Sequence, residues 1–382
     1  MKRKILSVFA LCFSVIAASA APNTVQASKF GYNTADATGA LQSAIDSGAK
    51  TVIIDDTGSE WRVGPIRLRS DLKLVVGENV VLAAKEGAFN GQLAFLLAAD
   101  ECRNLVIRGE KNAVLRMDKK EYQDPARCRP SEWRHAVSLR GCTDVTVRDL
   151  IIDGSGGDGV YVGATPKQAG CRNILLENLD IRNHHRQAIS IISAENLLIR
   201  RCKLRLTAGT PPACGIDFEP NSPHNFLVNC RIEDCEITGN DNYGILFVFS
   251  HLNRESRPVS ITIADSLVND NRRGGVRSEA CLPGRTAVTG SIDFRNCRIE
   301  TGSGEGIRFN NQSADGVRIA FRDCSVSSTA KDASPVVISS KLHENFGNID
   351  LGNLAITDNL SRSAVHVSGL GTAGIASLDG KP

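Results

Sequence analysis

A short pattern recurs along most of this chain, in which a small residue, usually Gly, precedes alternating apolar positions. Two further short apolar segments follow in most repeats, and residues 145–147 and 150–152 are one such pair. Alternation with a period of two gives each strand one buried side and one solvent-facing side. Three short strands per repeat therefore predict an all-β, stacked solenoid. Copies of the pattern begin at Ala136, Gly159, Ala188, Gly215, Gly244, Gly275 and Gly306, at intervals of 23 to 31 residues.

The cysteines fit the same repeat. Buried Cys behaves as a small apolar side chain, and adjacent coils of a solenoid are about 4.8 Å apart. We therefore predict internal ladders of cysteines rather than disulfides. The chain has no C-x-x-C motif, so no metal site is predicted. One inward-facing column contains Leu150, Leu179, Cys202, Cys235, Ser266, Cys297, Cys324 and Leu354, and a second column near a turn contains Cys102, Cys142 and Cys171.

The N-terminal 20 residues have the composition of a signal peptide. Lys2-Arg3-Lys4 is a basic start, residues 5–18 are an apolar run, and Ala18-Ser19-Ala20 is a small-x-small cleavage site. The apolar run is short for a membrane span of roughly 20 residues. We expect a secreted or periplasmic protein that has no contact with a membrane after cleavage.

The mature chain, residues 21–382, is predicted to be one domain. Residues 36–45 form a short amphipathic segment with an acidic start, which predicts a helix that caps the first coil. Residues 118–133 interrupt the repeat, so a loop that projects from the solenoid is expected there.

Composition excludes several classes of function. The chain has 382 residues, of which 42% are hydrophobic, and this is too apolar for a disordered protein. A net charge of +3 and an aromatic content of 5% do not indicate a nucleic-acid partner.

The opening FGYNTADATGALQSAIDSGAKTVII and the coil motifs GGDGVYVG, HHRQAISIISAENLLIRRC and GIDFEP resemble those of right-handed parallel β-helix proteins of the pectin-lyase-like superfamily. The resemblance extends over residues 28–360 and implies a single-stranded right-handed parallel β-helix. Members of this superfamily are mostly secreted carbohydrate-active enzymes, including pectate lyases, polygalacturonases, other glycoside hydrolases and uronate epimerases. The motifs of the individual subfamilies are absent at the equivalent strands, so the resemblance does not identify the reaction.

Two carboxylates on one strand are the strongest candidates for catalysis. In the copy that begins at Gly215, Asp217 and Glu219 are predicted to point outward on the same side. The facing positions in the adjacent coils are Ser190, Ile192, Leu246 and Val248, so no partner of opposite charge is expected there. Two nearby acids beside apolar groups should raise the pKa of at least one of them. Such a pair suits glycoside hydrolysis.

Neighbouring positions complete the predicted site. His185 could transfer protons, and Arg186 could bind an anionic group on a sugar, so both join the candidate catalytic residues. Arg277 could instead form a structural ladder with Glu279. The candidate substrate-binding residues are Asp158, Tyr161, Gln187, Ser190, Asn242, Tyr243, Arg277 and Glu279.

Three functions stay open on the sequence. The favoured one is a glycoside hydrolase that acts on a polysaccharide or oligosaccharide and requires no cofactor. The second is a polysaccharide lyase or epimerase that acts on a uronate, with Ca²⁺ held by Asp217 and Glu219 and with Arg186 or a His as base. The third is a glycan-binding solenoid without catalysis. The sequence does not fix the oligomeric state.

Overall fold

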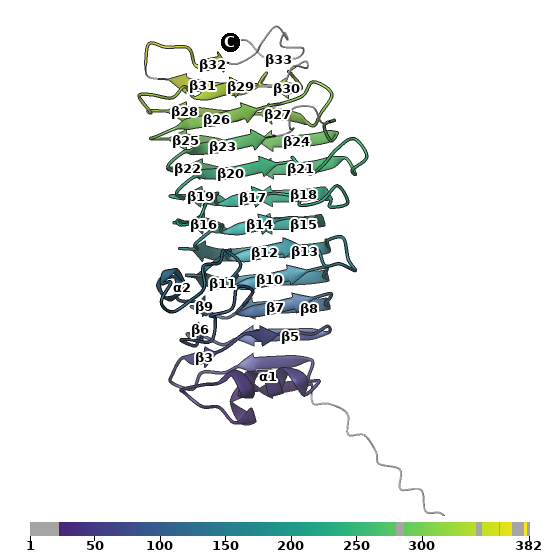
Figure 1. The fold of residues 1–382 in the computed structure, drawn as a ribbon, viewed down its shortest axis with the longest axis vertical. Coiled ribbons are helices and arrows are strands. Elements are labelled where there is room, and N and C mark those ends of the chain that lie inside the picture. Colours follow the sequence, from purple (N-terminus) through teal and green to yellow (C-terminus); the bar gives the residue numbers. More distant parts are fainter. Residues whose placement is uncertain (1–22, 280–285, 341–345, 359, 369–377, 380–382) are drawn as a thin grey trace, which may run out of the picture.

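The computed structural model describes residues 23–279, 286–340, 346–358, 360–368 and 378–379. The predicted signal peptide lies outside these residues. The described chain winds into a tall stack of coils in which every paired strand is parallel to its neighbours, apart from one isolated antiparallel bridge (Figure 1). The prediction of an all-β right-handed parallel β-helix is confirmed.

Two sheets run along the stack. The smaller one, sheet B, supplies one strand per coil and carries the candidate site. Its strands are β4 (Ile66–Arg67), β7 (Leu97–Asp100), β10 (Val137–Arg140), β12 (Val160–Gly163), β14 (Ile189–Ile191), β17 (Ile216–Phe218), β20 (Tyr243–Val248), β23 (Gly274–Glu279), β26 (Glu305–Asn310), β29 (Val336–Ser339) and β32 (Val365–Ser368).

The larger sheet, sheet A, contains the other strands in two series that bend around the opposite side of the stack. The first series is β1 (Thr24–Gln26), β2 (Thr51–Ile54), β5 (Leu72–Val76), β8 (Arg103–Gly109), β11 (Thr143–Asp153), β13 (Cys171–Arg182), β15 (Ala194–Arg200), β18 (Leu227–Glu233), β21 (Val259–Ala264), β24 (Gly290–Arg295), β27 (Arg318–Arg322), β30 (Ile349–Asp350) and β33 (Leu378–Asp379). The second is β3 (Trp61–Val63), β6 (Val81–Ala84), β9 (Val114–Arg116), β16 (Lys203–Arg205), β19 (Glu236–Thr238), β22 (Leu267–Asn269), β25 (Arg298–Thr301), β28 (Cys324–Ser328) and β31 (Leu354–Asp358), and the long strands β11 and β13 take part in both.

The alternation of side chains is the one that the sequence predicts. On sheet B, Ile216 and Phe218 of β17 are fully buried in the interior, while Asp217 between them points away from it. Phe218 stacks on Phe247 of the next coil, with ring centroids 5.1 Å apart. Burial of such aromatic and branched side chains along the whole stack is the main stabilising contribution.

The cysteine ladders are present in the interior. Cys142 donates its backbone N–H to the Cys171 Sγ at 3.3 Å, and Cys297 donates in the same way to the Cys324 Sγ at 3.4 Å. All ten cysteines within the described ranges are buried and free of disulfides. They therefore act as small core side chains, as predicted.

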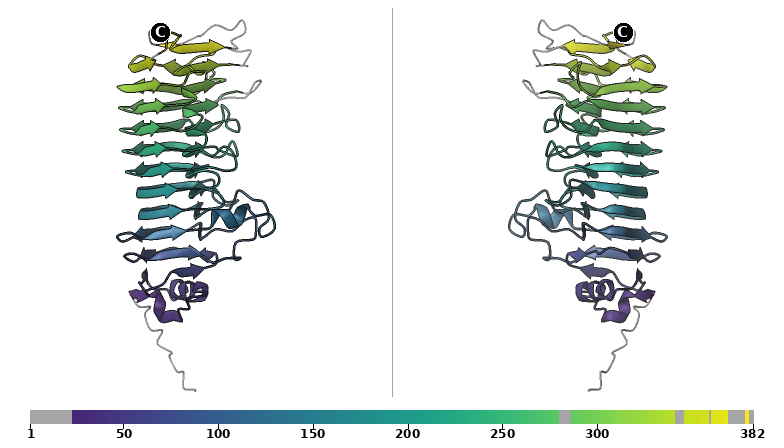
Figure 2. Two further views of the ribbon diagram at one scale, coloured as in Figure 1. Left: turned by 90° about the vertical axis from the view of Figure 1, so that its left-hand side faces the viewer. Right: turned by 90° about the vertical axis from the view of Figure 1, so that its right-hand side faces the viewer.

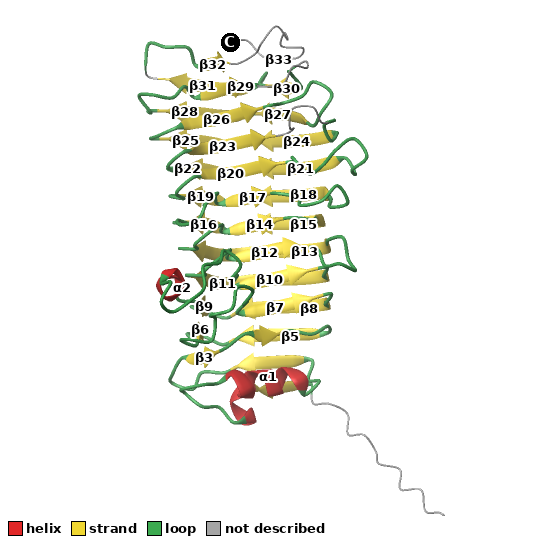
Figure 3. Ribbon diagram, viewed as in Figure 1, coloured by secondary structure: helices red, strands yellow, loops and turns green. Residues whose placement is uncertain are grey.

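The N-terminal cap is α1 (Thr38–Asp46), which covers the first coil (Figure 3). It begins two residues later than expected, because Asp36 accepts a hydrogen bond from the Thr38 backbone N–H at 3.0 Å and so marks the helix start from outside. A 3₁₀ turn (Ala27–Phe30) precedes it. α1 buries Leu41 and Ile45 against the core.

The segment between β9 and β10 leaves the stack and contains the short helix α2 (Lys119–Gln123) (Figure 2). It is anchored by Arg134, which is completely buried. The Arg134 Nε donates to the Phe89 carbonyl oxygen at 2.6 Å, and its Nη2 donates to the Arg129 carbonyl oxygen at 2.6 Å. These bonds fix the segment beside the outer face of sheet B.

Two features mark the turn before a strand of sheet B: a ladder of buried amides and the small residue that starts the repeat. Asn240 donates from Nδ2 to Asn271 Oδ1 at 2.8 Å, and Asn271 donates from Nδ2 to the Ile237 carbonyl oxygen at 3.0 Å. These buried amides fill the turn that leads into sheet B. A Cβ atom at Gly215 would lie 2.4 Å from Ile237 Cγ2 and 2.7 Å from the Gly244 carbonyl oxygen.

We expect Gly215→Ala to lower the free energy of unfolding by about 2 kcal/mol, because both neighbours belong to the rigid stack and cannot move aside. The matched control is Gly39→Ala in α1, where no atom lies within 4 Å of the added methyl group. Chemical denaturation of both variants measures the difference. Equal unfolding midpoints for the two variants would contradict the explanation.

Candidate active site

A cavity of about 430 Å³ lies on the outer face of sheet B beside the segment anchored by Arg134. We call it the central cavity. Strands β10 and β12 form part of its floor, and residues 132–135 contribute one wall. Its lining residues are Leu93, Phe95, Glu132, Trp133, His135, Ser138, Arg140, Tyr161, Arg186, Ile192, Glu219 and Asn221.

Arg186 is the centre of the charged groups. Its Nε donates to Glu132 Oε2 at 3.1 Å, and its Nη2 donates to Glu219 Oε2 at 3.1 Å. Its Nη1 lies 3.9 Å from Asp158 Oδ1. Burial lowers the pKa of Arg186, but the carboxylates of Asp158, Asp217 and Glu219 raise it more, so the guanidinium stays charged. The positions that face Asp217 in the adjacent strands are Ser190 and Leu246, as expected, so no ladder partner carries an opposite charge. The cation that pairs with Glu219 is instead Arg186, which reaches it from the turn before β14.

Asp217, two residues before Glu219, is completely buried. Its Oδ2 accepts a hydrogen bond from Gln187 Nε2 at 2.8 Å, whereas its Oδ1 has no hydrogen-bond partner. Burial, and then the nearby charge of Glu219, raise the pKa of Asp217 well above its usual range. The predicted rise in pKa is thus supported, but the prediction that Asp217 lies on an exposed strip is wrong. Gln187 holds Asp217 from the side and is also fully buried.

Asp158 and His135 form a second buried pair next to Arg186. His135 Nδ1 accepts a hydrogen bond from the Asp158 backbone N–H at 2.9 Å and lies 3.3 Å from Asp158 Oδ2. The imidazole is stacked between Phe95 and Tyr161, with centroid distances of 5.4 and 4.9 Å. Because Nδ1 accepts, the ring proton of neutral His135 is on Nε2.

Burial changes the pKa values of this group in opposite directions. It raises the pKa of Asp158 to about 7, although Arg186 opposes the rise. It lowers the pKa of His135 to about 3, and the positive charge of Arg186 adds to that effect. Burial also raises the pKa of Tyr161 to about 12. At neutral pH, His135 and Tyr161 are therefore uncharged hydrogen-bond donors to the central cavity.

The floor of the site contains polar atoms that the protein does not satisfy. Unpaired buried polar atoms are costly, and each one needs an explanation such as a bound water molecule or ligand. Three of these atoms come from neighbouring strands, because Ser138 pairs in register with Tyr161, Tyr161 with Ser190, and Ser190 with Asp217. The fourth comes from Asp158 in the turn before β12. The four atoms are Ser138 Oγ, Asp158 Oδ2, Ser190 Oγ and Asp217 Oδ1.

His185 is not brought to the carboxylate pair. It lines a separate cavity of about 490 Å³ on the other side of Glu132 and Trp133. Gln123 Nε2 is 2.6 Å from its Nδ1, and Thr210 Oγ1 is 2.8 Å from its Nε2, so both ring nitrogens are occupied. Burial lowers its pKa. The structure therefore gives no support to His185 as a catalytic residue of the central cavity.

The remaining predicted residues lie further along the stack. Tyr243, Arg277 and Glu279 line another cavity of about 670 Å³, which is away from the carboxylate pair. Arg277 forms an ion pair with Glu279 in the same strand, and its guanidinium lies over the Tyr243 ring. These contacts fit the alternative in which Arg277 pairs with Glu279 and has a structural role. Asn242 lies in the turn before β20 and donates its backbone N–H to the Ala213 carbonyl oxygen.

Several residues of the central cavity were not predicted as site residues. Glu132 and Trp133 belong to the inserted segment, which has no repeat from which a facing position could be deduced. Three others could have been predicted from the repeat. They lie one coil before Asp158, Tyr161 and Gly163 and occupy the same columns, and they are His135, Ser138 and Arg140. Extending the columns by one coil finds them.

The structure also bears on metal binding and membranes. Within the described ranges, no group of three or more His, Cys, Asp or Glu side chains is arranged to hold a metal ion. The cation that contacts Glu219 is Arg186, so the residues around Asp217 and Glu219 do not fit the Ca²⁺ of the lyase alternative. No described helix is long and apolar enough to cross a membrane.

Comparison with known proteins agrees with the fold described above. A family model described as a right-handed β-helix region matches residues 126–281. The uncharacterized protein YclG of Bacillus subtilis is 22% identical over 243 residues, which are 55% of this chain and 41% of that protein. The chain thus spans about two fifths of the length of this relative.

Solved structures with the same fold have different functions. The A-module of the mannuronan C-5 epimerase AlgE4 of Azotobacter vinelandii aligns over 90% of this chain and 100% of its own, at 14% identity and a TM-score of 0.54. An exopolygalacturonase of Thermotoga maritima aligns over 89% and 93%, at 14% identity and a TM-score of 0.56. The surface adhesin PfbA of Streptococcus pneumoniae aligns over 90% and 99%, at 12% identity and a TM-score of 0.59. The chain therefore shares the right-handed parallel β-helix fold of these proteins.

Proposed function

We propose that the chain is an exported glycoside hydrolase that binds an uncharged sugar in the central cavity. The observation that carries the proposal is the Asp217–Glu219 pair, in which a buried carboxyl group with a raised pKa lies beside a carboxylate that lines the cavity. A general acid in glycoside hydrolysis needs a proton that it keeps near neutral pH.

The arrangement assigns separate roles to the carboxylates. Asp217 keeps the proton and stays out of contact with the substrate. The Glu219 carboxylate, which reaches the cavity, accepts that proton and passes it to the leaving oxygen, so that Asp217 is left ionised. Glu132 lies across the Arg186 guanidinium and is the second carboxylate in the cavity, positioned to activate water or to attack the anomeric carbon. His135, Tyr161 and the unsatisfied Ser138, which all line the cavity, would donate to sugar hydroxyl groups. The exposed ring of Trp133 would stack on a sugar face.

Charge in the cavity favours this proposal over the lyase or epimerase alternative. A uronate carboxylate needs a cation that is free to neutralise it. Among the described lining residues the cations are Arg140 and Arg186, and both are already paired. Arg140 bonds to both carboxylate oxygens of Asp100, at 2.7 and 2.6 Å, and Arg186 bonds to Glu132 and Glu219.

The test is a screen of the mature protein against neutral and uronic polysaccharides, beside an Asp217→Asn/Glu219→Gln double variant. New reducing ends without ultraviolet absorbance, lost in the double variant, are the expected result. Absorbance from unsaturated products would transfer the assignment to a lyase. Glycan binding that is equal in both proteins, with no product, would instead support a binding solenoid like the adhesin.

A further inference from the structure

The central cavity continues toward the N-terminus into a second, more apolar cavity of about 390 Å³. We call this the apolar cavity. It shares Leu93, Phe95 and Arg140 with the central cavity, so the two form one continuous groove along the outer face of sheet B. Its other apolar lining includes Leu68 and Ala98.

The floor of the groove changes character between the two cavities. Tyr161, Ser138, Ala98 and Arg67 occupy one outward column in successive coils. The hydroxyl groups of the central cavity thus give way to a methyl group at Ala98, about 10 Å from Tyr161 for two coil spacings. Three charged residues line this cavity: Asp100 and Arg140, which are bonded to each other, and Arg67, which is exposed.

Leu93 stands at the border of the two cavities and is 66% exposed. Trp133, which lines the central cavity with it, is 46% exposed. Large apolar side chains grouped at a binding groove commonly mark contact with a ligand. The segment that carries Leu93 is held in place through the buried Arg134, which binds the carbonyl groups of Phe89 and Asn90.

We propose that the apolar cavity binds an alkyl, acyl or aryl group attached to the sugar in the central cavity, so that the preferred substrate is a glycoside with an apolar substituent. This rests on the proposed function only in placing the sugar in the central cavity. The continuity of the groove, the change of floor from hydroxyl to methyl groups and the exposed leucine support it together.

The test compares octyl β-D-glucoside with methyl β-D-glucoside, titrated into the full chain below the micelle concentration. Calorimetry and tryptophan fluorescence report binding. The chain has two Trp residues, and Trp61 is fully buried, so a fluorescence change reports on Trp133. We expect the octyl compound to bind at least about tenfold more tightly, since burial of a few methylene groups is worth a factor of that size.

Leu93→Asn should remove most of this octyl-to-methyl ratio. The matched control is Leu206→Asn, which changes a leucine of 52% exposure that lines neither cavity and should leave the ratio unchanged. Equal binding of the two glucosides, or an unchanged ratio in Leu93→Asn, would overturn the proposal. This measurement needs no turnover, so the octyl compound can bind more tightly even if the chain is not a hydrolase. Equally, the chain can be a hydrolase even if the two glucosides bind equally well.

Discussion

Replacement of Glu219 by Gln is expected to lower kcat about 10³-fold on the glycan that the screen identifies, which is the usual range for loss of a general acid. Gln keeps the shape of the side chain and still reaches the cavity, so KM should change little. The amide cannot share the Asp217 proton or deliver it to a leaving oxygen. Steady-state kinetics of the two proteins measure the effect.

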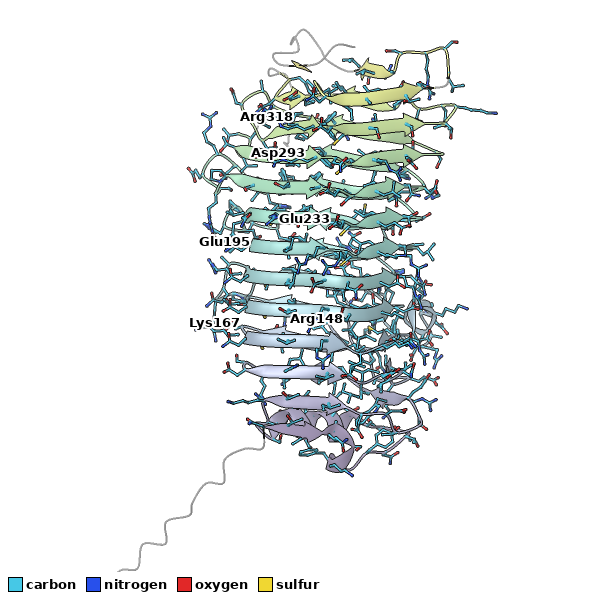
Figure 4. The ribbon with its side chains drawn as sticks, turned by 180° about the vertical axis from the view of Figure 1, so that it is seen from behind. Arg148, Lys167, Glu195, Glu233, Asp293 and Arg318 are labelled. Carbon is cyan, nitrogen blue, oxygen red and sulfur yellow. The ribbon has the colours of Figure 1, made fainter. Side chains whose placement is uncertain are left out.

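Glu195→Gln is the matched control. Glu195, like Glu219, is paired with arginine, in its case Arg172 and Arg257, and its side chain is similarly exposed. It lies on sheet A at the back of the molecule (Figure 4). Its replacement should leave kcat unchanged. If Glu219→Gln retained near-normal kcat, Glu219 would not be the proton donor, and Glu132 would become the next candidate.

The solenoid could be predicted because its rules are local and repeat. An inward Ile and an inward Phe on either side of an outward residue define a strand of sheet B wherever they follow a small residue, as in β17. The requirement for the small residue has a physical cause in the contacts of Gly215 with Ile237 and with the next coil. Each copy therefore carries the full signal, and the columns could be aligned without a structure.

The site could be predicted only where it follows that repeat. Asp217 could be found from the column that also contains Tyr161 and Ser190, and Glu219 from the outward column two residues further along the strand. The ion pair of Glu219 depends on the side chain of Arg186, whose direction out of a turn is not set by strand alternation. Glu132 and Trp133 come from an insertion that is fixed by carbonyl groups bound to Arg134, and no periodic pattern encodes such contacts.

Folding shifts the pKa values of the neighbouring residues His135 and Asp158 in opposite directions. The folded state keeps a proton on Asp158 up to about pH 7 and keeps His135 neutral down to about pH 3. In the unfolded chain, ordinary values are about 4 for Asp and 6.5 for His. Between these pH values the two groups change the stability in opposite directions, because folding binds a proton at Asp158 and excludes one at His135.

Asp158→Asn should change how the free energy of unfolding depends on pH, because it removes one of these two opposing contributions. Between about pH 4 and pH 7 the unfolded wild type loses the Asp158 proton while the folded protein keeps it, so this group makes the free energy of unfolding fall as pH rises. Asn removes that term. The free energy of unfolding of Asp158→Asn, minus that of the wild type, should therefore increase with pH by about 1.4 kcal/mol per unit over this range.

Chemical denaturation at several pH values between 4 and 8 measures the difference. His135→Gln is the matched variant, and its difference from the wild type should instead increase as pH falls from 6.5 toward 3, because the unfolded histidine binds a proton that the folded protein excludes. A difference for Asp158→Asn that stays constant over the whole range would mean that Asp158 is ionised in the folded protein. The acidic cluster around Arg186 would then hold one more negative charge, and an uncharged sugar would be favoured further in the central cavity.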